Sequence, residues 1–271
     1  MVQLFENDLI ETQLKSSKGN QYKWRSGDTW YKADYTGYEG LAEYVISHLL
    51  GKTSLRDDEY LLYDLEDISY KTNIYHGVKS KHFLDDGWQL ITLERLFKNT
   101  YGQGLNSMIY KTEDITNRLK LLVDETQRLT GLKDFGIYMS KMLTVDSFFL
   151  NEDRHTHNIA VLTNGTGEYK LCPLFDQGAG LLSDTTLDYP LGGDIYEMID
   201  SVKPKTFCDS FIDQLEIAEK LYGYNIKFNF TKKEIDAILD AVPNGMYSEE
   251  IIERVRKVCY ERRRQYSYLF A

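Results

Sequence analysis

The sequence predicts an α+β fold with two lobes, a small β-rich N-terminal lobe and a mainly helical C-terminal lobe. A change of composition indicates this division. The first hundred residues are rich in Tyr, Trp, Thr and Gly, whereas much of the remainder has apolar residues at helical spacing. The chain of 271 residues is long enough for one sizeable core or for two lobes. Because the change falls near residues 98–104, we place the lobes at residues 1–98 and 99–271.

The N-terminal lobe is expected to combine strands with one buried helix. Leu41, Val45 and Leu49 lie at helical spacing and form an apolar stripe, which predicts the helix. Asp86 and Gly87 form a pair typical of hairpin turns, which predicts that the strands on either side pair with each other. In chain order, the expected elements are strands at residues 22–24 and 29–33, a helix that begins near residues 35–37, and strands at residues 75–84 and 88–93.

The C-terminal lobe is expected to be a helical scaffold around one hairpin. Asn164 and Gly165 form a strong hairpin signal between two extended segments. Thr231 and Glu234 have the spacing of a capping box, which predicts the start of a helix. The expected helices span residues 113–130, 133–149, 206–222, 231–241 and 248–270, and the hairpin strands span residues 159–162 and 169–175.

A polar run at residues 151–158, which we call the catalytic loop, carries the strongest functional signal. Asp153 has the position of a residue that orients and deprotonates an attacking hydroxyl, and Asn158 that of a metal ligand. Asp176 follows the expected hairpin and precedes Gln-Gly, so it can bridge metal ions to phosphates. Loop, strand, turn, strand and Asp-x-Gly follow the order of a phosphoryl-transfer site. A simpler alternative is a local ion pair between Asp153 and Arg154.

Residues 16–20 contain a candidate phosphate-binding turn. Gly19 would allow backbone amides to approach phosphate oxygens closely, and Ser17 and Lys18 could add donors. A polar hairpin turn with a glycine is the simpler explanation for the same residues.

Lys32 ends an expected strand and is a candidate for neutralising the phosphates of a nucleotide. Glu39 and Glu43 lie one turn apart in the helix that follows, so either carboxylate could reach Lys32. The alternative for each glutamate is a solvent-exposed charge on the helix surface.

The run Asp-Arg-His-x-x-Asn-Ile at residues 153–159 resembles the catalytic loop of phosphoinositide 3- and 4-kinases. The wider pattern resembles the kinase module of HipA-like serine/threonine kinases more closely, because a comparably long hairpin separates Asn158 from Asp176. The small size is similar to the compact, stand-alone relatives of the CtkA type. This resemblance implies a protein-kinase-like fold and an ATP- and Mg²⁺-dependent phosphotransferase. It also implies a protein substrate with a serine or threonine hydroxyl, and autophosphorylation is one form of that activity.

The resemblance assigns roles to the residues of the catalytic loop. It implies Asp153 as catalytic base and Asn158 and Asp176 as Mg²⁺ ligands. The loop of the phosphoinositide kinases further suggests that His155 supports the loop backbone or stabilises the γ-phosphate. Gln177 stands where eukaryotic protein kinases usually have phenylalanine, so regulation by a flipping phenylalanine is not implied.

The resemblance also assigns nucleotide contacts in the N-terminal half. It favours Glu39 over Glu43 as the partner of Lys32. It places the adenine-contacting hinge at residues 94–97, which makes Glu94 and Leu96 candidate contacts of the nucleotide. A simple strand-to-helix turn is the alternative for the same residues.

Composition limits the partners that this chain is expected to have. With 42 acidic and 32 basic residues, the net charge is −10, which disfavours direct binding of nucleic acid or anionic membranes. Three widely spaced cysteines without metal-binding spacing predict reduced core residues. No signal pattern or long apolar run is present, so we expect a cytoplasmic protein. The sequence leaves open an antitoxin-like partner and delivery to another cell.

Two other classes of function fit the same motifs. An ATP-binding pseudokinase could use the fold as a scaffold, although all three oxygen-bearing motif positions are filled. A small-molecule or lipid kinase, or a nucleotidyl transferase, could use the fold for a different transfer, since one scaffold can carry several chemistries.

Overall fold

The computed structural model describes residues 1–10 and 21–270. The chain divides into two compact units, each assembled from segments that are distant in sequence. These units are not the two lobes predicted from the sequence, with a boundary between residues 98 and 99, and that boundary stays a prediction. Unit 1 comprises Met1–Phe83, Phe175–Val202 and Lys227–Ala271, and unit 2 comprises Leu84–Leu174 and Lys203–Ile226.

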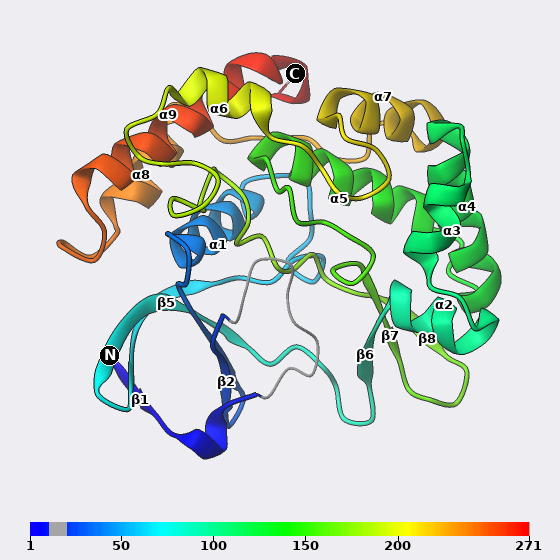
Figure 1. Ribbon diagram of the computed structural model, residues 1–271, viewed down its shortest axis with the longest axis horizontal. Helices are drawn as coiled ribbons and strands as arrows, with labels where there is room; N and C mark the ends of the chain where they lie inside the picture. Colours follow the sequence, from blue (N-terminus) through cyan, green and yellow to red (C-terminus); the bar gives the residue numbers. More distant parts are fainter. Residues whose placement is uncertain (11–20, 271) are drawn as a thin grey trace. The chain divides into compact units, whose positions relative to one another are not determined.

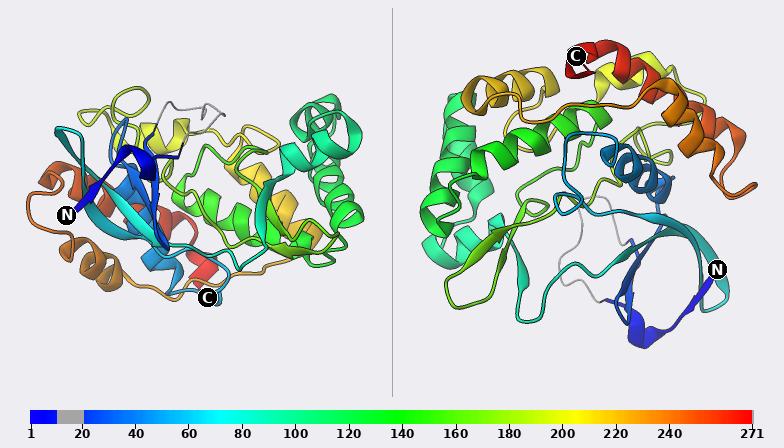
Figure 2. Two further views of the ribbon diagram at one scale, coloured as in Figure 1. Left: turned by 90° about the horizontal axis from the view of Figure 1, so that it is seen from below. Right: turned by 180° about the vertical axis from the view of Figure 1, so that it is seen from behind.

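Unit 1 is built on a five-stranded sheet with the order β1-β4-β5-β3-β2. Its neighbours are antiparallel except for β1 and β4, which are parallel. The sheet is strongly curled (Figure 1), and the curl is also visible from behind (Figure 2). A small apolar core of this sheet includes Trp24, Ile68 and Tyr70. The strands are β1 (Val2–Leu4), β2 (Lys23–Ser26), β3 (Thr29–Ala33), β4 (Asp64–Tyr70) and β5 (Asn73–Lys81).

Helix α1 (Glu39–Leu50) packs on this sheet and is the helix predicted from its apolar stripe. Gly40 of α1 and Gly77 of β5 lie so close that a Cβ on Gly40 would approach the Gly77 backbone to 2.8 Å. A Cβ on Gly77 would in turn overlap the Lys32 carbonyl. The two glycines therefore allow the first turns of α1 to approach β3 and β5 closely.

The remaining helices of unit 1 lie after residue 194. α1 packs on α8, and both α8 and α6 pack on α9. The predicted capping box of Thr231 and Glu234 is present at the start of α8. These helices are α6 (Ile195–Ser201), α8 (Lys232–Asp240) and α9 (Glu249–Gln265), and short 3-10 segments span Glu6–Asp8 and Ser267–Phe270.

Unit 2 is mainly helical and carries a three-stranded sheet with the order β6-β7-β8. The hairpin predicted from Asn164 and Gly165 is confirmed, since β7 and β8 pair antiparallel with Val161 opposite Leu171. In the described part of the chain, no helix is long and apolar enough to cross a bilayer. The elements are α2 (Leu93–Tyr101), α3 (Leu105–Lys111), α4 (Ile115–Thr130), α5 (Phe135–Phe149), α7 (Phe211–Tyr222), β6 (Gln89–Thr92), β7 (Ala160–Thr163) and β8 (Tyr169–Leu171).

The hairpin predicted around Asp86 and Gly87 is wrong. The turn itself forms, because Gly87 has a φ of 80° and the Trp88 N–H donates to the Asp85 carbonyl at 3.0 Å. The strands on either side belong to different sheets, since β5 pairs with β3 and β4 whereas β6 pairs with β7. A local turn signal specifies the turn but not the partners of the flanking strands.

Cys172, Cys208 and Cys259 are buried and form no disulfide, as the sequence predicted. Burial raises the pKa of Cys172 and that of Cys259 to about 12. Since the thiolate is the reactive form, these two thiols are inert core residues.

Candidate active site

Lys32 joins two carboxylates in unit 1. Its Nζ donates to Oε1 of Glu43 at 2.6 Å and to Oδ1 of Asp176 at 2.8 Å. The ammonium also lies 5.1 Å from the ring centre of Tyr63. Burial alone would lower the pKa of Lys32, but the carboxylates of Asp176 and Glu43 outweigh it and raise that pKa well above its ordinary value. The two carboxylates therefore favour the charged form of Lys32. We call Lys32, Glu43 and Asp176 the lysine cluster.

Glu43 connects the lysine cluster to the backbone that follows Asp176. Its side chain is only 2% exposed, and its second oxygen, Oε2, accepts a hydrogen bond from the Gln177 N–H at 3.0 Å. Asp176 itself has a φ of 60°, in the left-handed region. A non-glycine residue holds this conformation only where its surroundings compensate the strain. Here the Asp176 carboxylate is held by Lys32, and the next N–H, that of Gln177, is held by Glu43.

The expectation that Glu39 holds Lys32 is wrong, because Glu43 makes that contact. α1 begins at Glu39, and the Glu39 carboxylate folds back onto the segment before the helix. It accepts hydrogen bonds from the N–H groups of Tyr35, Thr36 and Gly37 at 2.8–3.2 Å. Free N–H groups at a helix start attract a carboxylate, so the first glutamate stabilises the helix end. Glu43, one turn later, reaches the strand.

Residues 178–189 are anchored to the start of α1. The Tyr38 N–H donates to the Ser183 carbonyl at 3.1 Å, and the Tyr38 hydroxyl donates to the Leu181 carbonyl at 2.7 Å. A Cβ on Gly37 would overlap the Ser183 carbonyl, so only glycine fits there. The backbone that follows Asp176 is thus positioned by the same helix that carries Glu43.

Asp34 lies between β3 and α1 and accepts hydrogen bonds from the Gly40 N–H at 2.5 Å and from the Tyr247 hydroxyl at 2.8 Å. Burial and the neighbouring Glu39 carboxylate raise the pKa of Asp34 to about 8, although both donors lower it. In an unfolded chain an aspartate titrates near about 4. A raised pKa in the folded state means that protonated Asp34 stabilises the fold below about pH 4 and that this stability is lost as the pH rises through about 8.

We therefore expect Asp34→Asn to flatten the pH dependence of the melting temperature. The amide keeps the size of the side chain and stays neutral, so the wild type should lose stability relative to the variant between about pH 4 and about pH 8. Thermal unfolding followed by circular dichroism across this range measures the difference. Parallel curves for the two proteins would contradict the assignment.

Lys23, which was not predicted from the sequence, lies directly opposite Lys32 across β2 and β3. The Lys23 ammonium is 4.0 Å from Oδ1 of Asp176. Two like charges opposite each other in a sheet repel unless an anion lies between them. Asp176 is that anion. The register of β2 against β3 would have identified Lys23 as a neighbour of Lys32, but the sequence does not give this register.

In unit 2, the catalytic loop begins where α5 ends. Leu150 has a φ of 58° and ends the helix in the left-handed conformation. Two tight turns follow, with the His155 N–H donating to the Asp153 carbonyl at 2.9 Å and the Asn158 N–H donating to the His155 carbonyl at 2.8 Å. The side-chain amide of Asn158 donates to the Asp153 carbonyl at 2.9 Å. Asp153 and Asn158, both predicted from the sequence, therefore lie together.

Arg154 pairs with Asp146 of α5. Arg154 Nε lies 2.9 Å from Oδ2 of Asp146, and the two side chains are 1% and 0% exposed. The other side of the guanidinium donates to the Asn158 carbonyl at 2.9 Å. The arginine thus fastens the loop to the helix that precedes it, and the alternative of a local Asp153–Arg154 ion pair stays a prediction.

Besides Asn158, the side chains of Lys205 and His155 lie close to the Asp153 carboxylate. Nζ of Lys205 lies 3.5 Å from Oδ1, and Nε2 of His155 lies 3.9 Å from Oδ2. The structure thus places His155 at the predicted base, whereas its catalytic role stays a prediction. Lys205 comes from a segment more than fifty residues later, so local sequence patterns carried no signal for it.

Glu94 and Leu96, predicted to lie in an adenine-contacting hinge, are part of a helix, and their contact with a nucleotide stays a prediction. Both lie in α2, and the Leu96 side chain is only 4% exposed. The Glu94 N–H donates to the Thr156 carbonyl at 3.2 Å, and the Glu94 carboxylate accepts from the Thr156 hydroxyl at 2.8 Å. Glu94 thus supports the catalytic loop, and the segment after β6 is the strand-to-helix turn that was the alternative to a hinge.

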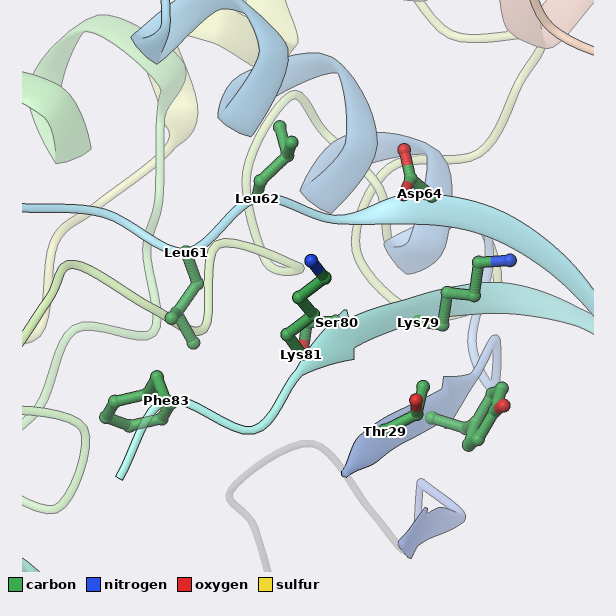
Figure 3. A pocket seen from close by; sticks show the side chains of 9 residues that line it. Thr29, Leu61, Leu62, Asp64, Lys79, Ser80, Lys81 and Phe83 are labelled. Carbon is green, nitrogen blue, oxygen red and sulfur yellow. The ribbon is translucent and has the colours of Figure 1, made fainter. Parts of the chain in front are cut away.

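Unit 1 has a pocket of about 420 Å³ beside β3 and β5 (Figure 3). Tyr31, Lys79 and Lys81 contribute to its wall. Tyr31 precedes Lys32 in β3 and lies opposite Lys79 of β5, and successive residues of a strand point to opposite faces. The part of the wall formed by Tyr31, Lys79 and Lys81 therefore belongs to the sheet face that does not carry Lys32, and no residue of the lysine cluster lines the pocket.

The candidate phosphate-binding residues Ser17, Lys18 and Gly19 lie outside the described residues. Within the described part of the chain, no group of three or more His, Cys, Asp or Glu side chains is arranged to hold a metal ion. The predicted Mg²⁺ ligands are one carboxylate and one amide oxygen. Mg²⁺ commonly takes only one or two protein ligands and completes its shell with water and phosphate oxygens, so Asp176 and Asn158 have suitable chemistry for it.

No protein-family model and no curated protein matches the sequence. Among solved structures, the chain is similar to the proinflammatory kinase CtkA of Helicobacter pylori, with a TM-score of 0.61 and 16% identity over 99% of this chain and 95% of that chain. HipA of Shewanella oneidensis MR-1, solved with HipB and operator DNA, has a TM-score of 0.46 and 12% identity over 96% of this chain and 63% of that chain. Fam20 of hydra, solved with sugar, has a TM-score of 0.38 and 11% identity over 91% and 82%.

The similarity to CtkA covers nearly the whole of both chains, whereas the lower TM-scores of the other two carry no argument. At this identity the similarity concerns the fold alone. The chain therefore has the α+β fold of the kinase CtkA, with a curled, β-rich N-terminal part and a mainly helical C-terminal part, as its sequence predicted.

Proposed function

We propose that this protein is an ATP- and Mg²⁺-dependent phosphotransferase that transfers the γ-phosphoryl group to a serine or threonine hydroxyl of a protein. The observation that carries the proposal is the lysine cluster, in which Lys32 bridges Glu43 at 2.6 Å and Asp176 at 2.8 Å. A strand lysine held by a helix glutamate and facing a metal-binding aspartate is the arrangement that protein kinases use. The kinase-like fold supports it.

Each residue has a defined task in this proposal. Lys32 neutralises phosphate charge, and Glu43 holds it in position. Asp153 accepts the proton of the acceptor hydroxyl while the hydroxyl oxygen forms a bond to the γ-phosphorus. The bond from that phosphorus to the β–γ bridging oxygen breaks, and its electron pair stays with ADP. Asp176 and Asn158 would hold Mg²⁺, which supplies positive charge to the phosphates.

Label transfer from ATP tests the proposal. Purified protein is incubated with γ-labelled or α-labelled ATP, with and without Mg²⁺, and with dephosphorylated casein as acceptor. We expect label from the γ-position alone, on casein or on the protein itself, and only with Mg²⁺. Label from the α-position would indicate nucleotidyl transfer, and ATP binding without any transfer would indicate a pseudokinase.

Asp153→Asn and Asp176→Asn should fail in different ways. Asp153→Asn should leave ATP binding intact and reduce transfer by about 100- to 10,000-fold, since a general base is lost. Asp176→Asn should also lose Mg²⁺-dependent nucleotide binding, because the amide carries no charge for the metal. Titration calorimetry with ATP and Mg²⁺, run beside the label assay, separates the two. Wild-type rates in either variant would refute its role.

A further inference from the structure

Lys205 is held at the catalytic loop by its neighbours along the chain. Thr206 is fully buried, and its hydroxyl donates to the Arg154 carbonyl at 2.7 Å. Arg118 donates to the Phe207 carbonyl at 3.1 Å. The backbone around Lys205 is therefore fixed beside the loop, whereas its side chain is 45% exposed and has room to turn.

The Lys205 ammonium places a positive charge at the carboxylate that we propose as catalytic base. Its Nζ lies 3.5 Å from Oδ1 of Asp153, whose side chain is only 12% exposed. A base that is itself an anion repels the phosphoryl group towards which it directs the acceptor. A cation next to that base offsets the repulsion and can turn to meet the charge that develops on the transferred group.

We propose that Lys205 is a catalytic residue that contacts the transferred phosphoryl group, an inference that rests on the proposed function. In the step, the acceptor oxygen bonds to the γ-phosphorus, the bond to the bridging oxygen breaks with its electron pair going to ADP, and the proton passes to Asp153. Lys205 neither gives nor takes a proton. Its three N–H donors bind the equatorial phosphoryl oxygens, where the charge of the transition state is spread.

A purely structural role predicts a different outcome. If Lys205 only paired with Asp153 to hold the loop, its loss would lower the stability and would not change kcat in the folded protein. Lys203 offers a matched control, because it lies two residues earlier in the same segment and pairs with Asp209 at 3.7 Å with both side chains exposed. A change at Lys203 removes the same charge from the same segment without touching Asp153.

The experiment compares Lys205→Met, Lys205→Arg and Lys203→Met with the wild type. Initial rates with γ-labelled ATP and dephosphorylated casein, together with labelling of the protein itself, give kcat and KM for ATP. We expect Lys205→Met to lower kcat by about 100-fold, as for loss of one transition-state donor, with KM for ATP nearly unchanged. Lys205→Arg should recover a large part of the rate, and Lys203→Met should match the wild type. All variants should melt at the wild-type temperature.

Three outcomes would overturn the inference. Equal kcat values for Lys205→Met and Lys203→Met would show that the ammonium has no part in the step. A lowered melting temperature that accounts for the lost rate, without recovery by Lys205→Arg, would show a structural role. In both cases transfer by the wild type leaves the proposed function standing. Absence of γ-transfer by the wild type would remove the proposed function and the role of Lys205 together.

Discussion

Replacing Lys32 by Met is expected to lower kcat/KM for ATP by about 100- to 1,000-fold, because a preorganised cation at the phosphates is lost. Glu43→Gln should act in the same direction but less strongly, since the amide can still accept a hydrogen bond from Lys32. The two residues touch at 2.6 Å, so the double variant should lose less than the sum of the single losses in free energy. Initial rates with γ-labelled ATP measure all four proteins.

Glu39→Gln is the matched control for this double-mutant cycle. Glu39 lies one turn from Glu43 on the same helix, but its carboxylate binds the N–H groups before the helix and not Lys32. We expect this variant to melt at a lower temperature and to keep most of the transfer rate. Its losses should add to those of Lys32→Met. Additive losses for Lys32 and Glu43 would contradict their coupling.

Replacing Arg154 by Met is expected to cost about 3–5 kcal/mol of unfolding free energy, because it leaves the buried Asp146 carboxylate without its partner. Burial raises the pKa of Asp146, and Arg154 opposes this. Without the arginine, the folded-state pKa rises further above the unfolded value. The variant should therefore be closest to wild-type stability below about pH 4 and lose stability as the pH rises. Urea denaturation at several pH values measures this.

The double variant Asp146→Leu/Arg154→Met tests the cause of that loss. Removing both charges leaves no unpaired ion, so the double variant should be more stable than Arg154→Met alone. Arg56→Met provides the surface control, since Arg56 is 71% exposed and pairs with exposed Asp58 at 3.0 Å. That change should cost about 1 kcal/mol or less. A double variant no more stable than Arg154→Met would show that the arginine acts through packing and not through its charge.

The helices were predictable because their signals are local. Apolar residues recur at the helical period in α4, α5, α7, α8 and α9. The capping box of Thr231 and Glu234 spans four residues and marks the start of α8. α2 was taken for a hinge because a short charged-aromatic run has the same composition in a helix and in a linker. β4 was not predicted at all, although it is the central partner of β1 and β5.

The strand partners and the choice between Glu39 and Glu43 needed tertiary information. The hairpin signal at Gly87 specifies the conformation of the four residues of a turn. The position of β5 in the sheet is stabilised by its pairing with β3 and β4 along most of its length. The two glutamates are one turn apart, so an uncertainty of a few residues in the helix start exchanges their roles. Only the start of α1 at Glu39 assigns one carboxylate to the helix end and the other to Lys32.

The sequence by itself determined the fold class. It also determined that Asp153 and Asn158 lie close together, because they belong to one run of six residues, which folds into two tight turns. It also identified Lys32 and Asp176 as residues of one chemistry. Only the tertiary structure brought these two within 2.8 Å, paired Arg154 with Asp146 and set Lys205 beside Asp153. Charged residues that are distant along the chain become neighbours through the packing of whole strands and helices. Their spacing in the sequence therefore does not predict these contacts.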